Sequence, residues 1–275
     1  MHQVRKAAVA GTFYPGNSHA LADAVGRLLA DACAHDPHHP QTGVAPKALI
    51  VPHAGYVYSG STAAGAYATL TASAQTIRRV VLLGPVHRVP VRGLAAPGVE
   101  AFSTPLGEIA IDMDAIASLA HLPQVTVSSA AHAMEHSLEV QLPFLQVVLH
   151  NFKLVPLAVG DATAAEVAQV LTALWGGPET LILISSDLSH FLPYAKAQAT
   201  DRETMDHILR LDGPLNHTQA CGATPINGLL LAARTHHLHA QLLSQCNSGD
   251  TAGDRQRVVG YAAVAFTEGD DHAIH

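Results

Sequence analysis

Ionisable side chains stand just after several apolar runs of this chain, where each run is expected to end as a buried strand. His53 follows ALIVP, and His87 follows VVLLGPV. Asp187 and His190 follow LILISS in the same way. If these strands are parallel, their carboxyl ends lie along one edge of the sheet, where ligand sites of open α/β sheets form. The pattern therefore predicts that residues distant in sequence converge at one site.

Neutral imidazoles combined with carboxylates are suitable ligands for a borderline divalent metal ion. Two histidines and one carboxylate leave open coordination positions, the arrangement used by non-haem Fe(II) oxygenases. Zinc with an activated water is chemically possible with the same ligands, whereas magnesium prefers oxygen ligands. A histidine that is not a ligand could move protons near neutral pH, because its unperturbed pKa is about 6.5.

Two further segments carry residues of the same kinds. HAMEHSLEVQLPFLQ contains Glu135, His136 and Glu139, which we expect to open an amphipathic helix with residues 136 and 139 on one face. SQCNSGDTAGDRQ places Cys246 and Asp250 in a Gly-rich loop before the last expected strand. Both segments are candidates to complete a site formed at the strand ends.

A structural role is the simpler explanation for any one of these residues taken alone. A single histidine at a strand end is more often a hydrogen-bonded structural residue than a ligand, and Asp187 could cap a turn. Cys221, in ACGATPI, is expected to pack as a small apolar residue at a helix start. The recurrence of histidine at strand ends, with acids nearby, favours a common site over unrelated structural residues.

Apolar, β-branched runs alternate with Ala-rich stretches along the chain. We expect buried strands within 47–53, 78–87, 152–161, 180–190 and 258–266. We expect helices within 18–34, 59–73, 163–176, 195–211 and 225–237, with Asp161 or Thr163 capping the third. Segment 95–112 is expected to form a β-rich excursion or hairpin at the sheet edge. This order predicts a single α/β domain over residues 1–275, with a central, mainly parallel or mixed sheet flanked by helices, a His-rich loop near 35–40 and a flexible tail at 268–275.

The composition of the chain favours a compact globular domain and argues against several other classes of protein. The 275 residues are 48% hydrophobic and 13% charged, as expected for a compact domain. The net charge of -7 and the lack of a dense Lys/Arg block argue against a nucleic-acid surface. No apolar run approaches the roughly 20 residues that span a bilayer, and no signal-peptide core is evident. Three sparse cysteines indicate a reducing, cytoplasmic compartment. The Ala-rich faces of the expected helices could pack either in the core or against a second subunit of a homodimer.

The chain resembles the Memo family, known in bacteria as AmmeMemoRadiSam system protein B, in motifs spread over almost its whole length. These are RKAAVAGTFYPG, VPHAGYVYSGSTAAGAY, RRVVLLGPVHRVP, EHSLEVQLPFLQ, VPLAVGD, SSDLSHF, CGATPINGLL and SGDTAGDRQRVVGYAAVAF. They run in family order from near residue 5 to near residue 266. The resemblance implies a fold similar to that of the class III extradiol dioxygenases, which open catechol rings at a non-haem Fe(II).

Carried over position by position, the resemblance implies roles for individual residues. His53 and His87 match the two histidine metal ligands. His136 and His190 match second-sphere histidines, of which His190 would serve as acid/base. Asp187 would orient that region.

The third metal ligand differs from the pattern of some Memo relatives, which supply a cysteine from the loop before the last strand. Counted back from Tyr261, that place is taken here by Thr251, with Asp250 beside it. We therefore expect Asp250 as the third ligand, with Cys246 as the alternative. A carboxylate gives a harder, oxygenase-like site suited to Fe(II), while a thiolate would favour copper or zinc.

Two functions follow as expectations from the residues and the resemblance. The first is an Fe(II)-dependent oxidoreductase or dioxygenase that acts on a small aromatic or phenolic substrate. The second is a non-catalytic metal- or ligand-binding protein that acts with the AMMECR-type and radical SAM proteins of the same system.

Overall fold

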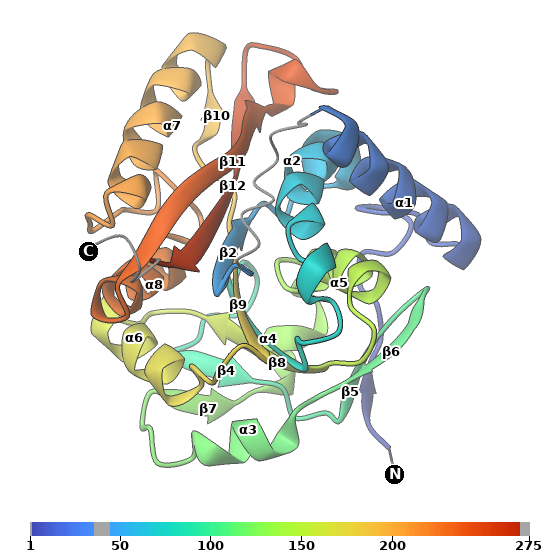
Figure 1. Cartoon of the computed structure of the whole chain (residues 1–275), viewed down its shortest axis with the longest axis vertical. Helices are drawn as coiled ribbons and strands as arrows, with labels where there is room; N and C mark the ends of the chain where they lie inside the picture. The colour runs from blue at the N-terminus through green and yellow to red at the C-terminus, as the bar shows by residue number, and fades with distance from the viewer. Residues whose placement is uncertain (1, 36–44, 270–275) are drawn as a thin grey trace, which may run out of the picture.

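The computed structural model describes residues 2–35 and 45–269 (Figure 1). Within these ranges the chain forms one α/β domain around a nine-stranded mixed sheet of order β10-β12-β2-β9-β3-β8-β4-β7, with β11 paired to β12. The strands are β2 (Ala48–Val51), β3 (Arg79–Pro85), β4 (Leu94–Ala96), β7 (Val125–Val127), β8 (Lys153–Val159), β9 (Thr180–Ser185), β10 (His190–Leu192), β11 (Leu238–Asn247) and β12 (Val258–Glu268). The expected single α/β domain with a central mixed sheet is confirmed.

The centre of this sheet is parallel. β2, β9, β3 and β8 lie side by side in parallel register, while β12 is antiparallel to β2 and β4 is antiparallel to β8. All five expected strands are present. β11 was missed because its sequence, LHAQLLSQCN, mixes polar and apolar residues without the continuous apolar run of a buried strand.

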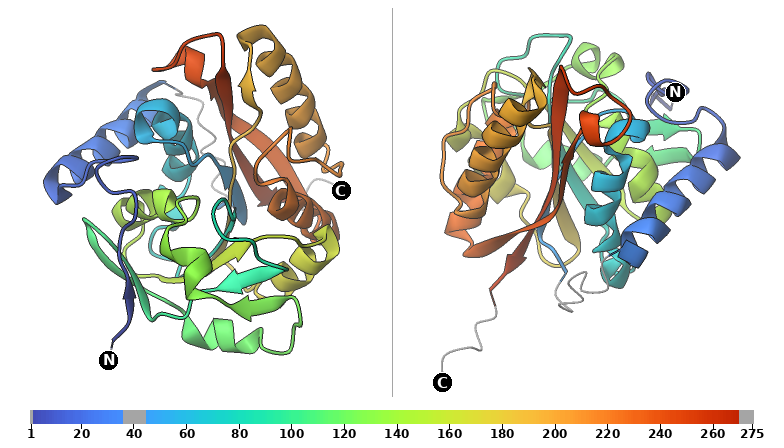
Figure 2. Two further views of the ribbon diagram at one scale, coloured as in Figure 1. Left: turned by 180° about the vertical axis from the view of Figure 1, so that it is seen from behind. Right: turned by 90° about the horizontal axis from the view of Figure 1, so that it is seen from above.

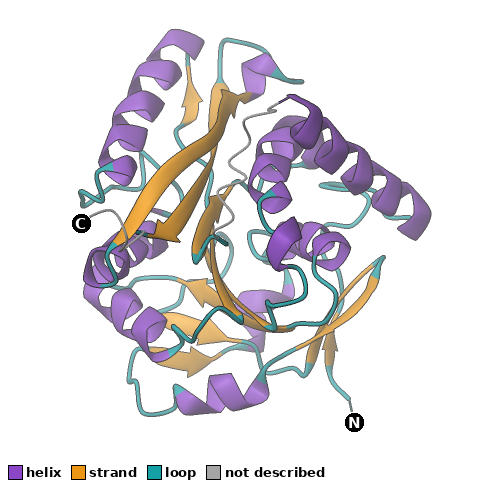
Figure 3. Cartoon of the chain, in the orientation of Figure 1, coloured by secondary structure: helices purple, strands orange, loops and turns teal. Residues whose placement is uncertain are grey.

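Helices cover both faces of the sheet (Figures 1 and 3). One face carries α1 (Ser18–His35), α2 (Tyr56–Ala68) and α5 (Leu142–Val148). The other carries α3 (Met113–Ser118), α6 (Ala164–Ala173), α7 (Tyr194–Leu209) and α8 (Ala223–Thr235). Seen from above, α1 and α2 lie on one side of the long strands β11 and β12, and α7 lies on the other (Figure 2). The five expected helices are present, and Thr163 rather than Asp161 caps α6 through a capping box with Glu166.

Alternate residues of the central strands explain these two layers. Leu49 and Val51 of β2 face the core under α1 and α2, while Ala48 and Ile50 face the core under α6 and α8. Every β2 side chain is buried, as expected for a parallel strand covered on both faces. Burying a side chain of this size contributes about 1.5–3 kcal/mol to folding.

Segment 95–112 contains the expected hairpin, but the hairpin belongs to a separate small sheet and does not extend the edge of the main one; residues 95 and 96 end β4 of the main sheet. The small sheet has the order β1-β5-β6, and β5 and β6 form an antiparallel hairpin. Its strands are β1 (Val4–Arg5), β5 (Ala101–Thr104) and β6 (Gly107–Ala110). The N-terminal segment thereby lies beside the hairpin (Figure 2).

The remaining elements are short. They are α4 (Ser129–Ala133) and the 3-10 turns η1 (Thr71–Ser73), η2 (Glu139–Gln141) and η3 (Ser248–Asp250). Most of the His-rich loop expected near 35–40 and all but the first residues of the expected tail at 268–275 lie outside the described residues. No helix in the described ranges is long and apolar enough to cross a bilayer.

Candidate metal centre

The ends of three central strands place the first residues of the site. β2 and β9 end in register, with Val51 opposite Ser185, and β3 pairs with β9 up to Leu83 and Ile184. Their parallel direction brings the loops that follow them to the same edge of the sheet. His53, His87 and Asp187 each follow the last residue of a strand by two positions.

Three imidazoles meet at this edge. One potential ligand atom from each of His53, His87 and His136 lies within 4.8 Å of those of the other two. Their ring centroids are 5.3 Å (His53–His87), 5.5 Å (His53–His136) and 4.7 Å (His87–His136) apart. His53 is buried, His136 is half-buried and His87 is exposed. The group could therefore hold a metal ion that remains accessible from the side of His87.

A chain of hydrogen bonds sets the tautomer of His53. Ser185 Oγ donates its only proton to the Ser137 carbonyl at 2.6 Å and accepts from Gln141 Nε2 at 2.8 Å. Since Ser185 can only accept, the 2.9 Å contact with His53 requires Nδ1 to carry the proton. The Nε2 lone pair of His53 is then available to a ligand.

Glu135 holds the other two imidazoles. Its carboxylate contacts His87 Nδ1 at 2.9 Å and His136 Nδ1 at 3.3 Å. It also accepts the backbone N–H groups of His87 at 2.6 Å, His136 at 2.9 Å and Ser137 at 3.0 Å. A carboxylate bonded to the Nδ1–H of a histidine leaves Nε2 free to bind a metal and is the usual second layer around metal-ligating histidines.

Burial and hydrogen bonding fix the charges of these groups. Burial is the main cause that lowers the pKa of His53 to about 4, although the Asp187 charge opposes it. His53 is therefore neutral at pH 7, as a metal ligand must be. Burial alone would raise the pKa of Glu135, but hydrogen bonds from His136, His87 and the Ser137 backbone outweigh it and hold that pKa well below its usual range. The site thus contains a buried negative charge, on Glu135, and a neutral imidazole, that of His53.

A close approach at Gly84 allows the segment that carries Glu135 and His136 to reach β3. A Cβ at this position would lie 2.8 Å from Ser137 Oγ and 3.0 Å from Leu138 Cδ2. Ser137 Oγ also donates to the Pro85 carbonyl at 2.8 Å. Glycine leaves the space in which this segment packs against the end of the strand.

Glu135, His136 and Glu139 do not open an α-helix, contrary to the sequence interpretation. Glu135 and His136 lie in the turn between α4 and η2, and Glu139 begins η2. Glu139 is fully buried and forms an ion pair with Arg5. It also accepts from Val9 N at 3.0 Å and from Tyr14 OH at 2.6 Å. Because the backbone N–H groups of His136 and Ser137 are bonded to the Glu135 carboxylate, a side chain accepts them where a helix would use its own carbonyls.

Asp187 and His190 lie in the loop and short strand that follow β9. Asp187 is buried, and its Oδ1 accepts the backbone N–H of His53 at 2.7 Å. It therefore positions the main chain of a site histidine. The ring Nδ1 of His190 lies 2.8 Å from the Leu188 carbonyl, so Nδ1 carries the proton and Nε2 is a free acceptor.

The two expected third ligands are engaged elsewhere and are not members of the three-histidine group. Asp250 is exposed on η3 and accepts from Tyr194 OH at 2.5 Å and from the Asn247 backbone at 3.1 Å. Cys246 Sγ lies 3.1 Å from Thr62 Oγ1, and burial raises the pKa of its thiol. His136, read from the resemblance as a second-sphere residue, occupies a place in the group instead.

Cys221 is a site residue that the sequence interpretation missed. Its sulfur lies 3.4 Å from His53 Nε2 and 3.3 Å from the backbone nitrogen of Asp187. Burial raises the pKa of this thiol to about 12, so it is protonated at pH 7 without a cation. The motif CGATPINGLL marked this segment, but a lone cysteine before a helix gave no sign of its contact with a histidine 168 positions away.

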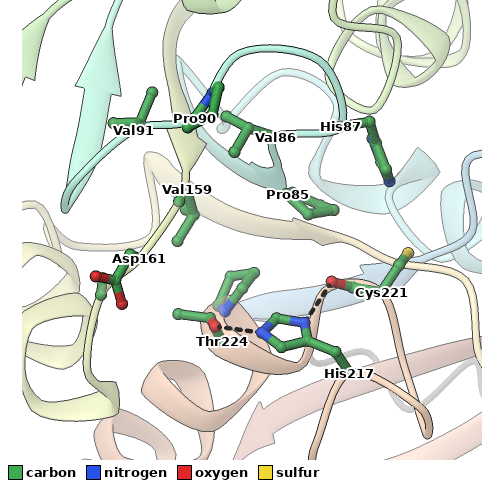
Figure 4. A pocket seen from close by; sticks show the side chains of 13 residues that line it. Pro85, Val86, His87, Pro90, Val91, Val159, Asp161, His217, Cys221 and Thr224 are labelled. Atoms are coloured by element: carbon green, nitrogen blue, oxygen red, sulfur yellow. Dashed lines mark hydrogen bonds between the residues drawn. The ribbon is translucent and has the colours of Figure 1, made fainter.

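A pocket of about 460 Å³ adjoins His87 and Cys221 (Figure 4). Its walls are mostly apolar, from Pro85, Val86, Pro90, Val91, Val159, Ala162 and Pro225. The polar or charged side chains among its lining residues include those of Asp161, His217 and Thr224. His217 lies between the Cys221 carbonyl and Thr224 Oγ1, each 3.3 Å from one ring nitrogen. A mostly apolar pocket with a few polar groups in its wall is the usual form of a small-molecule site.

Comparison with known proteins agrees with this architecture. The model of the family described as "Memo-like protein" matches residues 5–265. A "MEMO1 family protein" of Aquifex aeolicus is 34% identical over 276 residues, covering 96% of this chain and 99% of that relative. One of Methanosarcina acetivorans is 37% identical over 280 residues, covering 95% and 98%.

A solved structure shares the fold. The protein from Escherichia coli K12 titled "uncharacterized protein JW3007" superposes with a TM-score of 0.51 at 16% sequence identity. The match covers 79% of this chain and 98% of that chain. At this identity the likeness extends to the fold alone.

Proposed function

Since this chain belongs to the Memo family, we propose that it is a metal-dependent oxidoreductase whose Fe(II) ion is held by His53, His87 and His136. The convergence of three imidazoles, each with Nδ1 held by a neighbouring oxygen so that Nε2 is the nitrogen left for an ion, is the observation that carries the proposal. Three neutral nitrogen ligands suit a borderline divalent ion and leave open positions for a substrate.

The substrate proposed is a small aromatic or phenolic molecule. The pocket beside His87 has room for a compound of this size, and its apolar walls suit a ring. When bound, Fe(II) would supply redox chemistry and open positions for a chelating oxygen group. The resemblance to class III extradiol dioxygenases supports a reaction with dioxygen.

The residues of the chain would divide the remaining tasks. Glu135 orients His87 and His136, and Ser185 orients His53. His190 is proposed as the acid/base, since its Nε2 is free to take a proton. Asp187 is proposed as a positioning residue through its bond to the His53 backbone.

Metal content after anaerobic loading with Fe(II) tests the proposed centre. We expect one bound ion per chain in the wild type and none retained after gel filtration in the His53→Ala/His87→Ala variant. His217→Ala is the matched control, since this histidine lines the same pocket but is not part of the group. Equal iron content in the wild type and the double variant would overturn the proposed centre. Oxygen uptake on a panel of catechols, measured with the loaded protein, tests the reaction.

The metal affinities of the Asp250→Asn and His136→Ala variants, measured separately, test which residue is the third ligand. If His136 completes the set, His136→Ala lowers metal affinity and Asp250→Asn leaves it unchanged. The reverse result would restore the carboxylate as ligand. Cys246→Ser in the same series tests the remaining alternative.

A non-catalytic binding role is the second candidate. Val57 and Tyr58 are 63% and 38% exposed at the start of α2. Val57 also lines a separate pocket of about 480 Å³ with Phe13 and Tyr56. Exposed apolar side chains beside a pocket favour contact with another molecule. Tight metal binding without turnover, together with co-purification of AMMECR-type and radical SAM proteins, would favour this role.

A further inference from the structure

Asp201 is a buried carboxylate of α7 to which the proposed function assigns no task. The other buried side chains of this helix are apolar apart from one threonine, and are those of Ala197, Thr204, Met205 and Ile208. Asp201 is only 3% exposed, and in the described part of the chain it forms no ion pair with a lysine or arginine. Aspartate is rarely buried this deeply without a specific partner.

We infer that Asp201 is a positioning residue for His190, the acid/base of the function proposed above. The inference rests on that proposed function and adds to it the group that holds the acid/base in place. The partner of the Asp201 carboxylate is the backbone of the turn between β9 and β10, because its Oδ1 accepts the N–H of Ser189 at 3.0 Å. His190 is the next residue and begins β10.

Hydrogen bonds fix both sides of the residue that precedes His190. The N–H of Ser189 donates to Asp201, and its carbonyl accepts the N–H of Gly260 in β12 at 2.9 Å. The N–H of Leu188 donates to the Gly260 carbonyl at 2.8 Å, and the Leu188 carbonyl is the group 2.8 Å from His190 Nδ1. Because the imidazole is bonded to this turn, the hydrogen bond from α7 to the turn also fixes the orientation of the ring.

The fold leaves space for this carboxylate between α7 and β12. α7 packs against β10 and β12 (Figure 1). A Cβ at Gly260 would lie 2.0 Å from Asp201 Oδ2 and 2.6 Å from its Cγ, so the carboxylate occupies the place that a side chain would take at this position of the strand. After the turn, Phe191 has a φ of 58°, a left-handed conformation that bulky residues rarely adopt. Such a conformation persists only where the surrounding contacts hold the chain.

The charge of His190 also acts on Asp201. Burial is the main cause that raises the pKa of Asp201, and hydrogen bonds from Ser189 and the charge of His190 oppose it. At the start of the same turn, Asp187 accepts the backbone N–H of His53. Two buried carboxylates thus fix the two ends of segment 187–190, one against a metal-binding histidine and the other against α7.

Alanine and asparagine at position 201 test the inference. Asp201→Asn keeps an acceptor for the Ser189 N–H, while Asp201→Ala removes it. We expect Asp201→Ala to lower kcat for oxygen uptake on the catechol panel by about 10–100-fold, since small misplacements of a catalytic group have effects of this size. KM and Fe(II) content should stay unchanged, and Asp201→Asn should recover most of the lost kcat.

Thr204→Val is the matched control, because it changes a buried side chain of the same helix whose hydroxyl donates to the Thr200 carbonyl within α7. This variant should keep the wild-type kcat. An unchanged kcat in Asp201→Ala would overturn the inference. An equal loss in Thr204→Val, or a failure of Asp201→Asn to recover activity, would overturn it as well.

Nitrogen-15 NMR of the histidine rings provides a readout that does not need turnover. In the full-length protein with Zn(II) added, under alkaline conditions that keep imidazoles neutral, we expect His190 to carry its proton on Nδ1 in the wild type, Asp201→Asn and Thr204→Val. Asp201→Ala should lose this preference, and His190→Gln identifies the signals. The same tautomer in Asp201→Ala would contradict the inference. Absence of oxygen uptake in the wild type would overturn the proposed reaction alone, because the ring signals still test how His190 is positioned.

Discussion

Glu135→Gln should weaken metal binding with only a moderate loss of stability. The carboxylate is buried and accepts three backbone N–H groups as well as two imidazoles. Glutamine has nearly the same shape but no charge, and only one of its two terminal atoms accepts a hydrogen bond. The substitution therefore tests whether the charge and the second acceptor hold the histidines in their binding tautomer.

The magnitude follows from the contacts of the two oxygens. Oε1 accepts most of the bonds, while Oε2 accepts the backbone N–H of His87. The most favourable orientation of glutamine keeps Oε1 and turns its amide NH₂ toward the His87 N–H, so that two donors face each other and the His87 N–H loses its acceptor, at a cost of about 1–3 kcal/mol. Loss of a carboxylate behind a ligating histidine lowers metal affinity by about 10–100-fold.

Competition with a chromophoric chelator for Zn(II) or Co(II) measures the affinity. Glu139→Gln is the matched control, because this second buried carboxylate lies four positions along and binds Arg5 instead of a site histidine. We expect the control to lose stability but to keep its metal affinity after correction for folded protein. Wild-type affinity in Glu135→Gln, or an equal fall in both variants, would refute the role assigned to the carboxylate.

Three further outcomes are expected. Glu139→Gln should lower the free energy of unfolding by about 3–5 kcal/mol in urea titrations, since it leaves the buried Arg5 charge unpaired; a change within error would show that the ion pair is dispensable. Burial lowers the pKa of His132 to about 4, and the unfolded chain takes up its proton near pH 6.5, so this residue removes up to about 1.4 kcal/mol of stability per pH unit as the pH falls from 6.5 to 4. His132→Asn should flatten that fall between pH 7 and pH 5, and an unchanged slope would contradict burial as the cause. Gly84→Ala should cost about 1–3 kcal/mol and also weaken metal binding, because its Cβ would displace Ser137 and the segment that carries His136; normal affinity would show that the segment adjusts without moving the imidazole.

The pattern of residues along the chain was enough to predict the frame of the site. Continuous apolar runs identified the parallel strands, and the parallel arrangement explained why His53 and His87 meet, since strand ends at one edge bring their following loops together. The same pattern placed Asp187 at this edge, where its Oδ1 accepts the His53 backbone N–H. These predictions held because strand periodicity and strand direction are local and topological properties.

Only the tertiary structure decided which side chains complete the group. His136 joined it because Glu135 accepts the backbone N–H groups of His136 and Ser137. Glu139, in the same segment, is held by Arg5 and Tyr14, more than 100 positions away. Cys221 reached His53 because the turn before α8 passes the end of β9, which no residue in its own segment indicates. Hydrogen bonds between distant loops fix these positions, and such bonds leave no periodic pattern in the sequence.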